Sequence, residues 1–510
     1  MAASPVNLMK AFRTASLETM KSKPSTNSAL NSALASALAS REKRSIRRRL
    51  PLPTSSTSLS TSNPPVDFTS NDYLSLATST RLRRKVLEKL AASEEILGSC
   101  GSRLLVNPSA HVNLERRLES FFGEGTAKKG MIDHDDAVDE PPWTALLFNS
   151  GYDANVGLFT SVPQPGDVVV LDEYIHASVH DGVRASRVSR DSVLSFRHNS
   201  LEALRETLLQ ALEAGDERSI RLRDGSSSLF LAVESLYSMD GTLAPLREMS
   251  DMLEELFPKE NAYMIVDEAH ATGIYGTADR PGRGRVTMVG LDGVAGQSKG
   301  RVIARLHTFG KALGSSGAVI LTTPLIRDYL INYARSLIYT TSITHANVIA
   351  IGCSFDMIED GTAQELSKHL LSLSSYLVNL LHSTLKSYKI PSDVVFLPPH
   401  LLDYLNRPSS AFLPSSSLYS SSISPSPSST SPISPIIPLM TPQPRPLSAY
   451  LLTKCNINAR PISWPTVPKG ADRVRVCLHA GNTQQDVERL VDGVVGWYEE
   501  LQREGLKSRL

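Results

Sequence analysis

The sequence predicts an α/β fold with a large domain built on a mainly parallel seven-stranded sheet, followed by a small C-terminal α+β domain. Seven short apolar runs alternate with helical or polar stretches in the middle of the chain. Such alternation is typical of parallel strands joined by crossovers that cover both faces of a sheet. The 510 residues include 41% hydrophobic and 21% charged residues, which is ordinary for a large globular protein.

Each apolar run has the length of a buried strand. The candidate strands are Ala145–Phe148, Val168–Leu171, Val193–Phe196, Leu229–Val233, Met264–Val266, Val302–Leu306 and Ala318–Leu321. Ligand sites in such sheets lie beyond the carboxyl ends of the strands. We therefore expect functional residues in the polar segments after the strands: Asn149–Tyr152, Asp172–His176, Glu234–Ser238, Asp267–His270 and Thr308–Lys311.

Composition divides the chain into three parts. We expect a basic, Ser/Thr/Pro-rich segment with a short arm over residues 1–66, a large domain over 67–350 and a small domain over 351–510. Three stretches without periodicity read as looped-out insertions: 127–142, 279–301 and 409–446. The last is dominated by Ser and Pro, so it buries too little apolar surface to order itself, and we expect disorder there.

Charge and cysteine content exclude several functions. A formal net charge of +1 does not favour nucleic acid as a partner. Apolar runs long enough to cross a bilayer are missing, so no membrane span is expected. The four cysteines lack Cys-x-x-Cys spacing, which predicts neither a disulfide framework nor a metal site.

Both ends of the chain resemble targeting signals. Residues 1–50 have the composition of an organellar presequence, although Glu18 and Glu42 weaken it. Ser508-Arg509-Leu510 is a variant of the peroxisomal Ser-Lys-Leu address, and an ordinary basic tail is the equal alternative. We expect the peroxisome, otherwise the cytoplasm, and favour the mitochondrion less.

Lys311 lies between an apolar run and a glycine-rich turn, so it should project from a tight loop. A lysine held in this way can form a Schiff base. Asp267 ends a buried strand and needs a cationic partner, such as a protonated pyridine nitrogen. Pyridoxal phosphate requires a lysine, an acid on the ring nitrogen, a stacking group and phosphate donors. Candidates for all four follow predicted strands.

In combination, these motifs resemble the α-oxoamine synthase family of pyridoxal-phosphate enzymes, from about Arg47 to Trp497. The resemblance rests on Thr69–Leu74, Gly98–Arg103, Asn149–Tyr152, His176–Ser178, Ser238–Gly241, Asp267–His270, Arg305–Ala318 and Ile338–Ser342. It implies a fold-type I transferase, pyridoxal 5'-phosphate as cofactor and a homodimer. Cys100 stands where the family has glycine, and His307 stands where a small residue is frequent.

The resemblance also implies roles for individual residues. Lys311 would hold the cofactor and act as the base, Asp267 would pair with the ring nitrogen, and His176 would stack on the ring. The remaining cofactor residues would bind near the phenolic oxygen (Ser238, His270), bind the phosphate (Gly151, Tyr152, Thr308), or reach in from a second subunit (Thr340 or Thr341).

Three further residues concern the substrates. Arg475 matches the arginine that binds the amino-acid carboxylate, for which bidentate pairing is suited. Asn71 reads equally as a structural residue and as part of the substrate pocket. Arg47 reads as part of a solvated or targeting cluster by composition, whereas the resemblance makes it a partner for the carboxylate of the acyl chain.

The implied reaction is the decarboxylative condensation of L-alanine with pimeloyl-CoA, or another pimeloyl thioester, in biotin biosynthesis. The alternatives within the family are glycine C-acetyltransferase and 5-aminolevulinate synthase. A distant alternative is a DEAH-type NTPase, because Asp267–His270 also reads as a Walker B box. An NTPase needs Gly-x-x-x-x-Gly-Lys-Ser/Thr upstream, whereas Gly310-Lys311 lies downstream and precedes Ala312.

Overall fold

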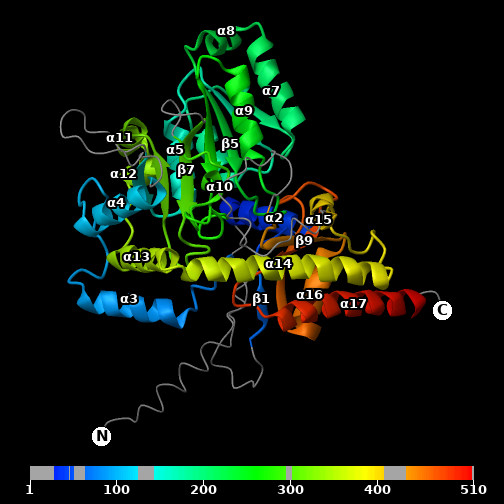
Figure 1. Cartoon of the computed structure of the whole chain (residues 1–510). Coiled ribbons are helices and arrows are strands. Elements are labelled where there is room, and N and C mark those ends of the chain that lie inside the picture. The colour runs from blue at the N-terminus through cyan, green and yellow to red at the C-terminus, as the bar shows by residue number, and fades with distance from the viewer. Residues whose placement is uncertain are drawn as a thin grey trace. The chain divides into compact units, whose positions relative to one another are not determined.

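The computed structural model describes residues 28–44, 46–50, 64–123, 143–293, 301–406 and 432–507, with side chains to residue 503 (Figure 1). The chain separates into two compact units, one of residues 1–63 with 464–466 and one of 64–463 with 467–510. The first contains helix α2 (Ala29–Lys43), which Ser28 caps by accepting from the Asn31 N–H at 3.2 Å. No residue of α2 is buried. All other elements belong to the second unit.

The second unit contains the seven-stranded sheet, with strand order β2-β8-β7-β6-β5-β3-β4. The strands are β2 (Thr144–Phe148), β3 (Val168–Asp172), β4 (Val193–Phe196), β5 (Leu229–Glu234), β6 (Ala262–Asp267), β7 (Val302–Thr308) and β8 (Ala318–Thr322). β8 is antiparallel to both of its neighbours, β2 and β7, and the other strand pairs described in this sheet are parallel. The predicted fold class and all seven predicted strands are confirmed.

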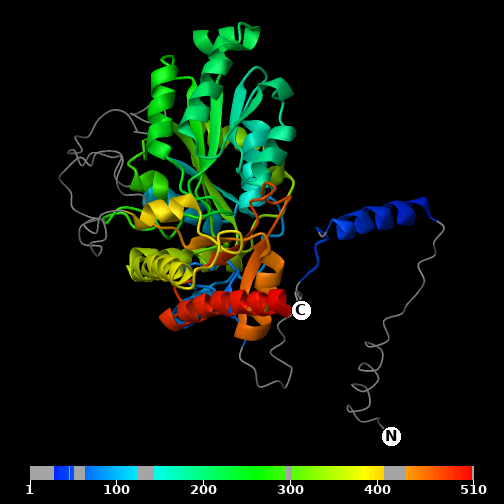
Figure 2. The same ribbon diagram turned by 90° about the vertical axis from the view of Figure 1, so that its right-hand side faces the viewer.

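Helices cover both faces of this sheet (Figures 1 and 2). One apolar cluster joins alternate strand residues such as Leu171 and Ala232 to α5 (Gly151–Ser161), α6 (Ala177–Arg184), α11 (Pro324–Tyr333) and α12 (Arg335–Ile338). The residues between them, such as Val170 and Val233, pack on the other face against α4 (Ser109–Gly123), α7 (Leu201–Glu213), α9 (Leu246–Leu256) and α13 (His345–Glu359). Burial on both faces explains why the strands read as continuous apolar runs.

The second sheet has the order β1-β10-β11-β9, with strands β1 (Val66–Phe68), β9 (Ile436–Met440), β10 (Ile457–Ile462) and β11 (Arg473–Cys477). Helices α14 (Thr362–Ser387), α15 (Pro399–Leu405), α16 (Pro444–Cys455) and α17 (Gln484–Lys507) accompany it, and α14 and α17 lie side by side (Figure 1). The first strand of this sheet therefore comes from the start of the expected large domain. The predicted domain boundaries otherwise stay a prediction.

Two of the expected insertions extend into ordered structure. Residues 436–446 were expected in the Ser/Pro-rich insertion, but they form β9 and the start of α16. Within 279–301, α10 (Arg285–Met288) is buried, and the Glu268 carboxylate accepts from the N–H groups of Arg285 and Val286 at 2.9 and 2.6 Å. The looped-out reading of 279–293 is therefore wrong. Residues 124–142, 294–300 and 407–431 lie outside the described residues.

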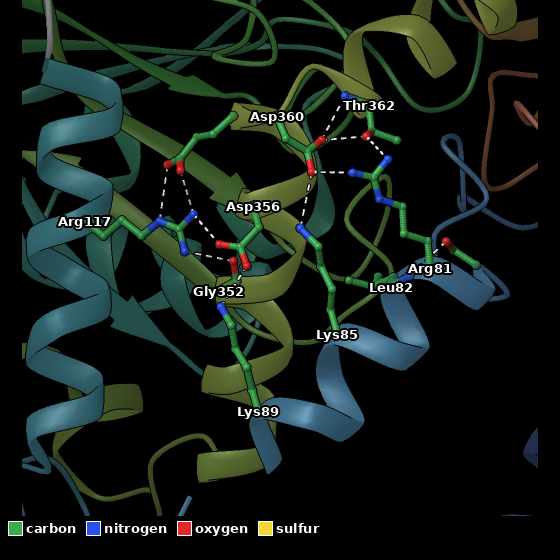
Figure 3. A network of polar contacts seen from close by, with 11 residues as sticks. Arg81, Leu82, Lys85, Lys89, Arg117, Gly352, Asp356, Asp360 and Thr362 are labelled. Carbon is green, nitrogen blue, oxygen red and sulfur yellow. Dashed lines mark hydrogen bonds and ion pairs between the residues drawn. The ribbon is translucent and has the colours of Figure 1, made fainter. Parts of the chain in front are cut away.

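Ion pairs connect α3 (Thr80–Ala92) to α13 and to the turn that follows it (Figure 3). Asp360 accepts from Arg81 at 2.8 Å and from Lys85 at 3.2 Å. Asp356 accepts from Lys89 at 2.7 Å and from Arg117 of α4 at 2.8 Å. Because these side chains are partly exposed, each pair contributes about 1 kcal/mol or less, and the network mainly orients α3.

Cys100 has φ +61°, a left-handed conformation that glycine adopts without steric cost. The family's glycine at this position is thus explained by backbone geometry. None of the helices that the structure describes is both long and apolar enough to cross a membrane.

Candidate active site

A cavity of about 340 Å³ lies where β5, β6 and β7 end and α5 begins. It collects most of the residues that the sequence singled out. Eight of them line it: Asn71, Gly151, Tyr152, His176, Asp267, His270, Thr308 and Lys311. The polar segments that follow these strands thus converge on one cavity, where ligands of such sheets bind.

Lys311 projects from a tight loop between β7 and β8, as the sequence predicted. Backbone bonds close the loop, with the Phe309 N–H donating to Gly317 O at 3.0 Å and the Ser315 N–H donating to Phe309 O at 2.8 Å. Burial lowers the pKa of Lys311, although the nearby carboxyl groups of Asp267 and Glu234 oppose this effect. A larger neutral fraction of the amine favours both nucleophilic attack and proton abstraction.

Two donors orient the Asp267 carboxylate at the end of β6. The Ala269 N–H donates to Oδ1 at 2.9 Å, and the Asn155 amide donates to Oδ2 at 2.9 Å. Asn155 lies on α5, and its Nδ2 also donates to the Ser178 hydroxyl at 3.0 Å. A buried carboxylate held in this way is ready to pair with a cationic ring nitrogen in the cavity.

His176 is held through the same hydrogen-bonded chain. Its Nδ1 lies 2.7 Å from the Ser178 hydroxyl and accepts from the Ser178 N–H at 3.2 Å. Burial lowers the pKa of His176, with Lys311 adding to the effect and Asp267 opposing it. The ring is therefore neutral at physiological pH and presents a flat face suited to stacking.

His270 and Arg475 are held by contacts that do not involve α5. The Tyr73 hydroxyl lies 2.7 Å from His270 Nδ1. Burial lowers the pKa of His270 well below its usual value, with Lys311 and Arg475 contributing. Arg475 comes from β11 of the second sheet and donates to Asn71 Oδ1 at 2.9 Å and to Ser238 O at 2.5 Å. A guanidinium fixed beside the cavity is suited to bind a carboxylate.

The start of α5 forms an anion-binding corner. Ser150 caps the helix by accepting from the Asp153 N–H at 3.1 Å, and a Cβ on Gly151 would lie 2.5 Å from Thr308 Cγ2. Glycine therefore allows Thr308 to pack closely against the start of the helix. Ser150, Gly151 and Tyr152 line the cavity, and the dipole of a helix N-terminus attracts phosphate. The Tyr152 hydroxyl is directed away, since it donates to Asp181 at 2.5 Å. The phosphate-binding role of Tyr152 stays a prediction.

Five predicted residues do not line this cavity, and the first of them, Arg475, lies beside it. Ser238 contributes its backbone carbonyl to Arg475, and a role for its hydroxyl stays a prediction. Thr340 Oγ1 and Thr341 O accept from the Asn149 amide at 3.2 and 2.6 Å, so their predicted role in a second subunit also stays untested. Arg47 belongs to the other compact unit, where it pairs with Glu42 at 3.5 Å.

Sequence reasoning assigned no individual role to three residues of the site. Asn155 links Asp267 to Ser178, and Tyr73 holds His270. Glu234 lines the cavity and pairs in register with Asp267 across β5 and β6. Two of these residues could have been found from the sequence. Glu234 is a charged residue at the end of an apolar strand, and Asn155 lies one helical turn after Gly151.

These groups fit pyridoxal 5'-phosphate, because the cavity combines an amine, an oriented carboxylate, a flat neutral ring and an open helix N-terminus. In that arrangement Lys311 would hold the aldehyde and Asp267 the ring nitrogen. Asp267, Ala269 and His270 line this cavity, whereas Glu268 holds α10. The residues that resemble a Walker B box therefore have other contacts in this structure.

Comparisons with known proteins agree with the geometry. The family model described as aminotransferase class I and II matches residues 63–494. The chain is 38% identical over 477 residues to an 8-amino-7-oxononanoate synthase of Emericella nidulans, covering 92% of this chain and 96% of the relative. It is 34% identical over 429 residues to an aminoacyl transferase of Aspergillus fumigatus, covering 84% of this chain and 79% of the relative.

Solved structures show the same fold. The serine palmitoyltransferase of Sphingomonas wittichii superposes with a TM-score of 0.66 at 21% identity, covering 93% of this chain and 99% of the other. The 8-amino-7-oxononanoate synthase of Francisella tularensis superposes with a TM-score of 0.54 at 21% identity, covering 86% of this chain and 98% of the other.

Proposed function

This chain belongs to the aminotransferase class I and II family as an α-oxoamine synthase, a pyridoxal-phosphate-dependent acyltransferase, and we propose that it is an 8-amino-7-oxononanoate synthase. The proposed substrates are L-alanine and pimeloyl-CoA or another pimeloyl thioester, as in biotin biosynthesis. The observation that carries this choice is the similarity to the Emericella nidulans enzyme of that name, which spans nearly the whole of both chains.

The residues of the cavity suit the steps of such a condensation. Arg475 binds the carboxylate of the amino acid, and the neutral amine of Lys311 takes the proton from its α-carbon. When bound, the cofactor supplies an electron sink for the charge that develops at this carbon. His176 would cover one face of the ring. The acyl carbonyl carbon bonds to the α-carbon of the amino acid as the thiol leaves, and the α-carboxylate then leaves as carbon dioxide. The first amides of α5 would anchor the phosphate and keep the reacting groups in place.

A different amino acid or acyl thioester in the same site is the second candidate. The similarity to the aminoacyl transferase of Aspergillus fumigatus favours it. Glycine C-acetyltransferase and 5-aminolevulinate synthase activities belong to this group of alternatives, because Arg475 binds any α-carboxylate. Arg47 is the residue that we propose to favour a dicarboxylic acyl chain.

The deciding experiment measures carbon dioxide and free thiol released by the purified holoenzyme. We expect turnover with L-alanine plus pimeloyl-CoA to exceed turnover with glycine plus acetyl-CoA or succinyl-CoA, and with L-serine plus a long-chain acyl-CoA. Equal or faster turnover with one of the other pairs would overturn the substrate choice. Lys311→Ala should abolish both turnover and the visible absorbance of the cofactor, whereas Lys386→Ala, an exposed lysine on α14, should change neither.

A homodimer is proposed on the basis of the family resemblance and of exposed apolar side chains close to the site. Leu97 and Leu105 are 77% and 82% exposed. Their segment contacts the one that contains Thr341, because the Gly101 carbonyl accepts from the N–H of Ser342 at 3.0 Å. Light scattering tests the mass. Mixing inactive Lys311→Ala and Thr341→Ala proteins tests sharing of the site, since activity returns only if each subunit contributes to its partner's site.

Peroxisomal location is proposed from Ser508-Arg509-Leu510, which lies outside the described residues. Deleting these three residues from a tagged protein should disperse its punctate distribution. A distribution that stays punctate after the deletion would contradict the address.

A further inference from the structure

A buried cluster of charged residues lies next to the cavity without lining it. His198 follows β4, Asp172 ends β3, and Asp240 lies in the turn after β5. His198 Nδ1 lies 2.8 Å from Asp172 Oδ1, and its Nε2 lies 3.3 Å from Asp240 Oδ2. The side chains of Asp172, Asp240 and His198 are 0%, 10% and 12% exposed. Burying charged groups costs free energy unless they are paired and hydrogen-bonded, so the contacts within this cluster need to be identified.

The contacts require protons on both ring nitrogens of His198. Asp172 has only acceptor atoms for Nδ1, so Nδ1 is the donor. The Thr242 hydroxyl donates to Asp240 Oδ1 at 2.8 Å, so it accepts from His198 Nε2, which lies 2.7 Å away. Asn199 places its amide 3.2 Å from Nε2 while its Oδ1 has no partner, and a rotated amide would satisfy both groups. His198 is therefore an imidazolium.

Other groups around the ring preserve this charge. The Tyr174 ring stacks on His198 at 4.3 Å between centroids, and the Tyr237 ring meets it edge-on at 4.4 Å. The Glu173 carboxylate accepts from the His198 backbone N–H at 3.0 Å. From the elements of the second sheet, Arg473 and His400 interact electrostatically with Asp240, and His400 also with His198.

Burial opposes the charge on the imidazole, but hydrogen bonds to the two carboxylates outweigh it. Together with the attraction of these carboxylates, they raise the pKa of His198 to about 9. The imidazolium therefore persists throughout the physiological pH range.

The cluster braces a turn that holds both arginines of β11. Asp240 Oδ1 also accepts from the Thr242 N–H at 3.1 Å, and a Cβ on Gly241 would lie 2.0 Å from Ile436 O of β9. The turn is therefore fixed between His198 and the second sheet. Its two outward carbonyls accept from arginine side chains, Ser238 O from Arg475 Nε at 2.5 Å and Met239 O from Arg473 Nη1 at 3.3 Å.

We propose that His198 is a positioning residue for binding of the amino-acid carboxylate. As an imidazolium between Asp172 and Asp240, it fixes the turn whose Ser238 carbonyl orients Arg475. The inference rests on the proposed function to the extent that Arg475 binds this carboxylate. It adds a residue that touches neither substrate nor cofactor but sets the affinity for one substrate.

The test compares steady-state kinetics of holoenzyme carrying His198→Asn with the wild type. We expect the KM for the amino acid to rise about tenfold, which corresponds to loss of one charge-assisted interaction, while kcat changes less than about twofold. The KM for the acyl thioester should stay unchanged. His382→Asn, the same substitution at an exposed position of α14, is the matched control and should leave all three parameters unchanged.

The pH profile separates positioning from a general loss of structure. The ratio of variant to wild-type KM should be largest below about pH 8 and should fall toward one as the pH passes 9, because the wild type then loses the same charge. In an Arg475→Lys background, His198→Asn should add less than it does alone, since both changes act on one guanidinium. His198→Gln, which keeps a longer donor, serves if the asparagine variant does not fold.

The outcomes distinguish this inference from the proposed function. If the wild type turns over another substrate pair, the proposed function fails, and the same comparison is made with that amino acid. If no pair is turned over, amino-acid binding is measured by the change in cofactor absorbance. An unchanged amino-acid KM or Kd, a loss confined to kcat, or an effect independent of pH and additive with Arg475→Lys would overturn the positioning role.

Discussion

Replacing His198 by asparagine should lower the stability of the holoenzyme most at neutral and mildly acidic pH. The folded protein raises the pKa of this histidine from 6.5 to about 9. A group whose pKa is higher in the folded than in the unfolded state stabilises the fold fully below its unfolded pKa. That contribution is lost as the pH rises through the folded pKa. The relevant window therefore runs from about pH 6.5 to about pH 9.

The size of this effect follows from the pKa. A rise from 6.5 to about 9 corresponds to about 3 kcal/mol, as an upper estimate, at about 1.4 kcal/mol for each pH unit. The side chain is only 12% exposed, so solvent screens the interaction weakly. For a chain of 510 residues, the entropy of unfolding is about 1 kcal/mol per degree, so the melting temperature should differ by about 3 °C.

Thermal melting of the wild type and His198→Asn holoenzymes is measured by circular dichroism at half-unit intervals from pH 6 to pH 9.5. Comparing the two proteins at each pH cancels the titration of groups that both contain. The difference in melting temperature should shrink as the pH rises. A difference that stays constant, or that grows toward pH 9.5, would refute the assignment of His198 as a buried imidazolium.

Three further substitutions test other parts of the structure. Gly151→Ala should weaken cofactor binding about tenfold or more in a fluorescence titration, because its Cβ would lie 2.5 Å from Thr308 Cγ2. Adding Thr308→Ser, which removes that methyl group, should restore most of the affinity. A double variant that binds no better than Gly151→Ala would contradict the steric explanation. Asp360→Asn should cost about 1 kcal/mol at low salt in denaturant titrations and almost nothing at high salt; a salt-independent loss would count against its two ion pairs. Glu234→Gln should keep turnover within about threefold, whereas Asp267→Asn should lower it by at least about a hundredfold; equal losses would show that both carboxyl groups act as anions.

The large sheet was predictable because its strands are buried on both faces. Leu171 and Val170 face opposite apolar clusters, so consecutive positions are all apolar and stand out from the polar segments between them. The strand β9 escaped prediction because Pro438 and the neighbouring serines resemble a disordered segment. It lies at the edge of its sheet, paired only with β11 among the strands described, and an edge strand tolerates proline.

Burial of charge was the feature that composition did not reveal. The Gly- and Arg-rich stretch after Asp279 reads as a surface loop, yet Arg285 is 5% exposed. Arg305, within β7, is fully buried, where it donates to Asp292 Oδ1 at 3.3 Å and to Arg283 O at 2.8 Å. Arginines can be buried when carboxylates and carbonyls satisfy their donors. Those partners come from distant positions, and sequence composition does not show which of them meet.

The candidate site was predictable where one residue ends one strand, as for Asp267 and Thr308. It was less predictable where two carboxyl groups at equivalent strand ends differ in their hydrogen-bond partners. Asp267 and Glu234 end adjacent strands in register, but donors from Ala269 and Asn155 hold the Asp267 carboxylate. Glu234 has a buried Oε1 without a partner among the described residues.

This difference in hydrogen bonding separates the chemistry of the two carboxyl groups. Burial, together with the charge of Asp267, raises the pKa of Glu234 well above its usual value, which favours the neutral form of this carboxyl group. Asp267 is the carboxyl group that hydrogen-bond donors orient toward the cavity chemistry. A single anion can pair with a cationic ring nitrogen while leaving the pKa of Lys311 lowered, whereas a second anion would favour the charged amine and oppose its action as a base. The raised pKa of Glu234 therefore favours the chemistry assigned to Lys311.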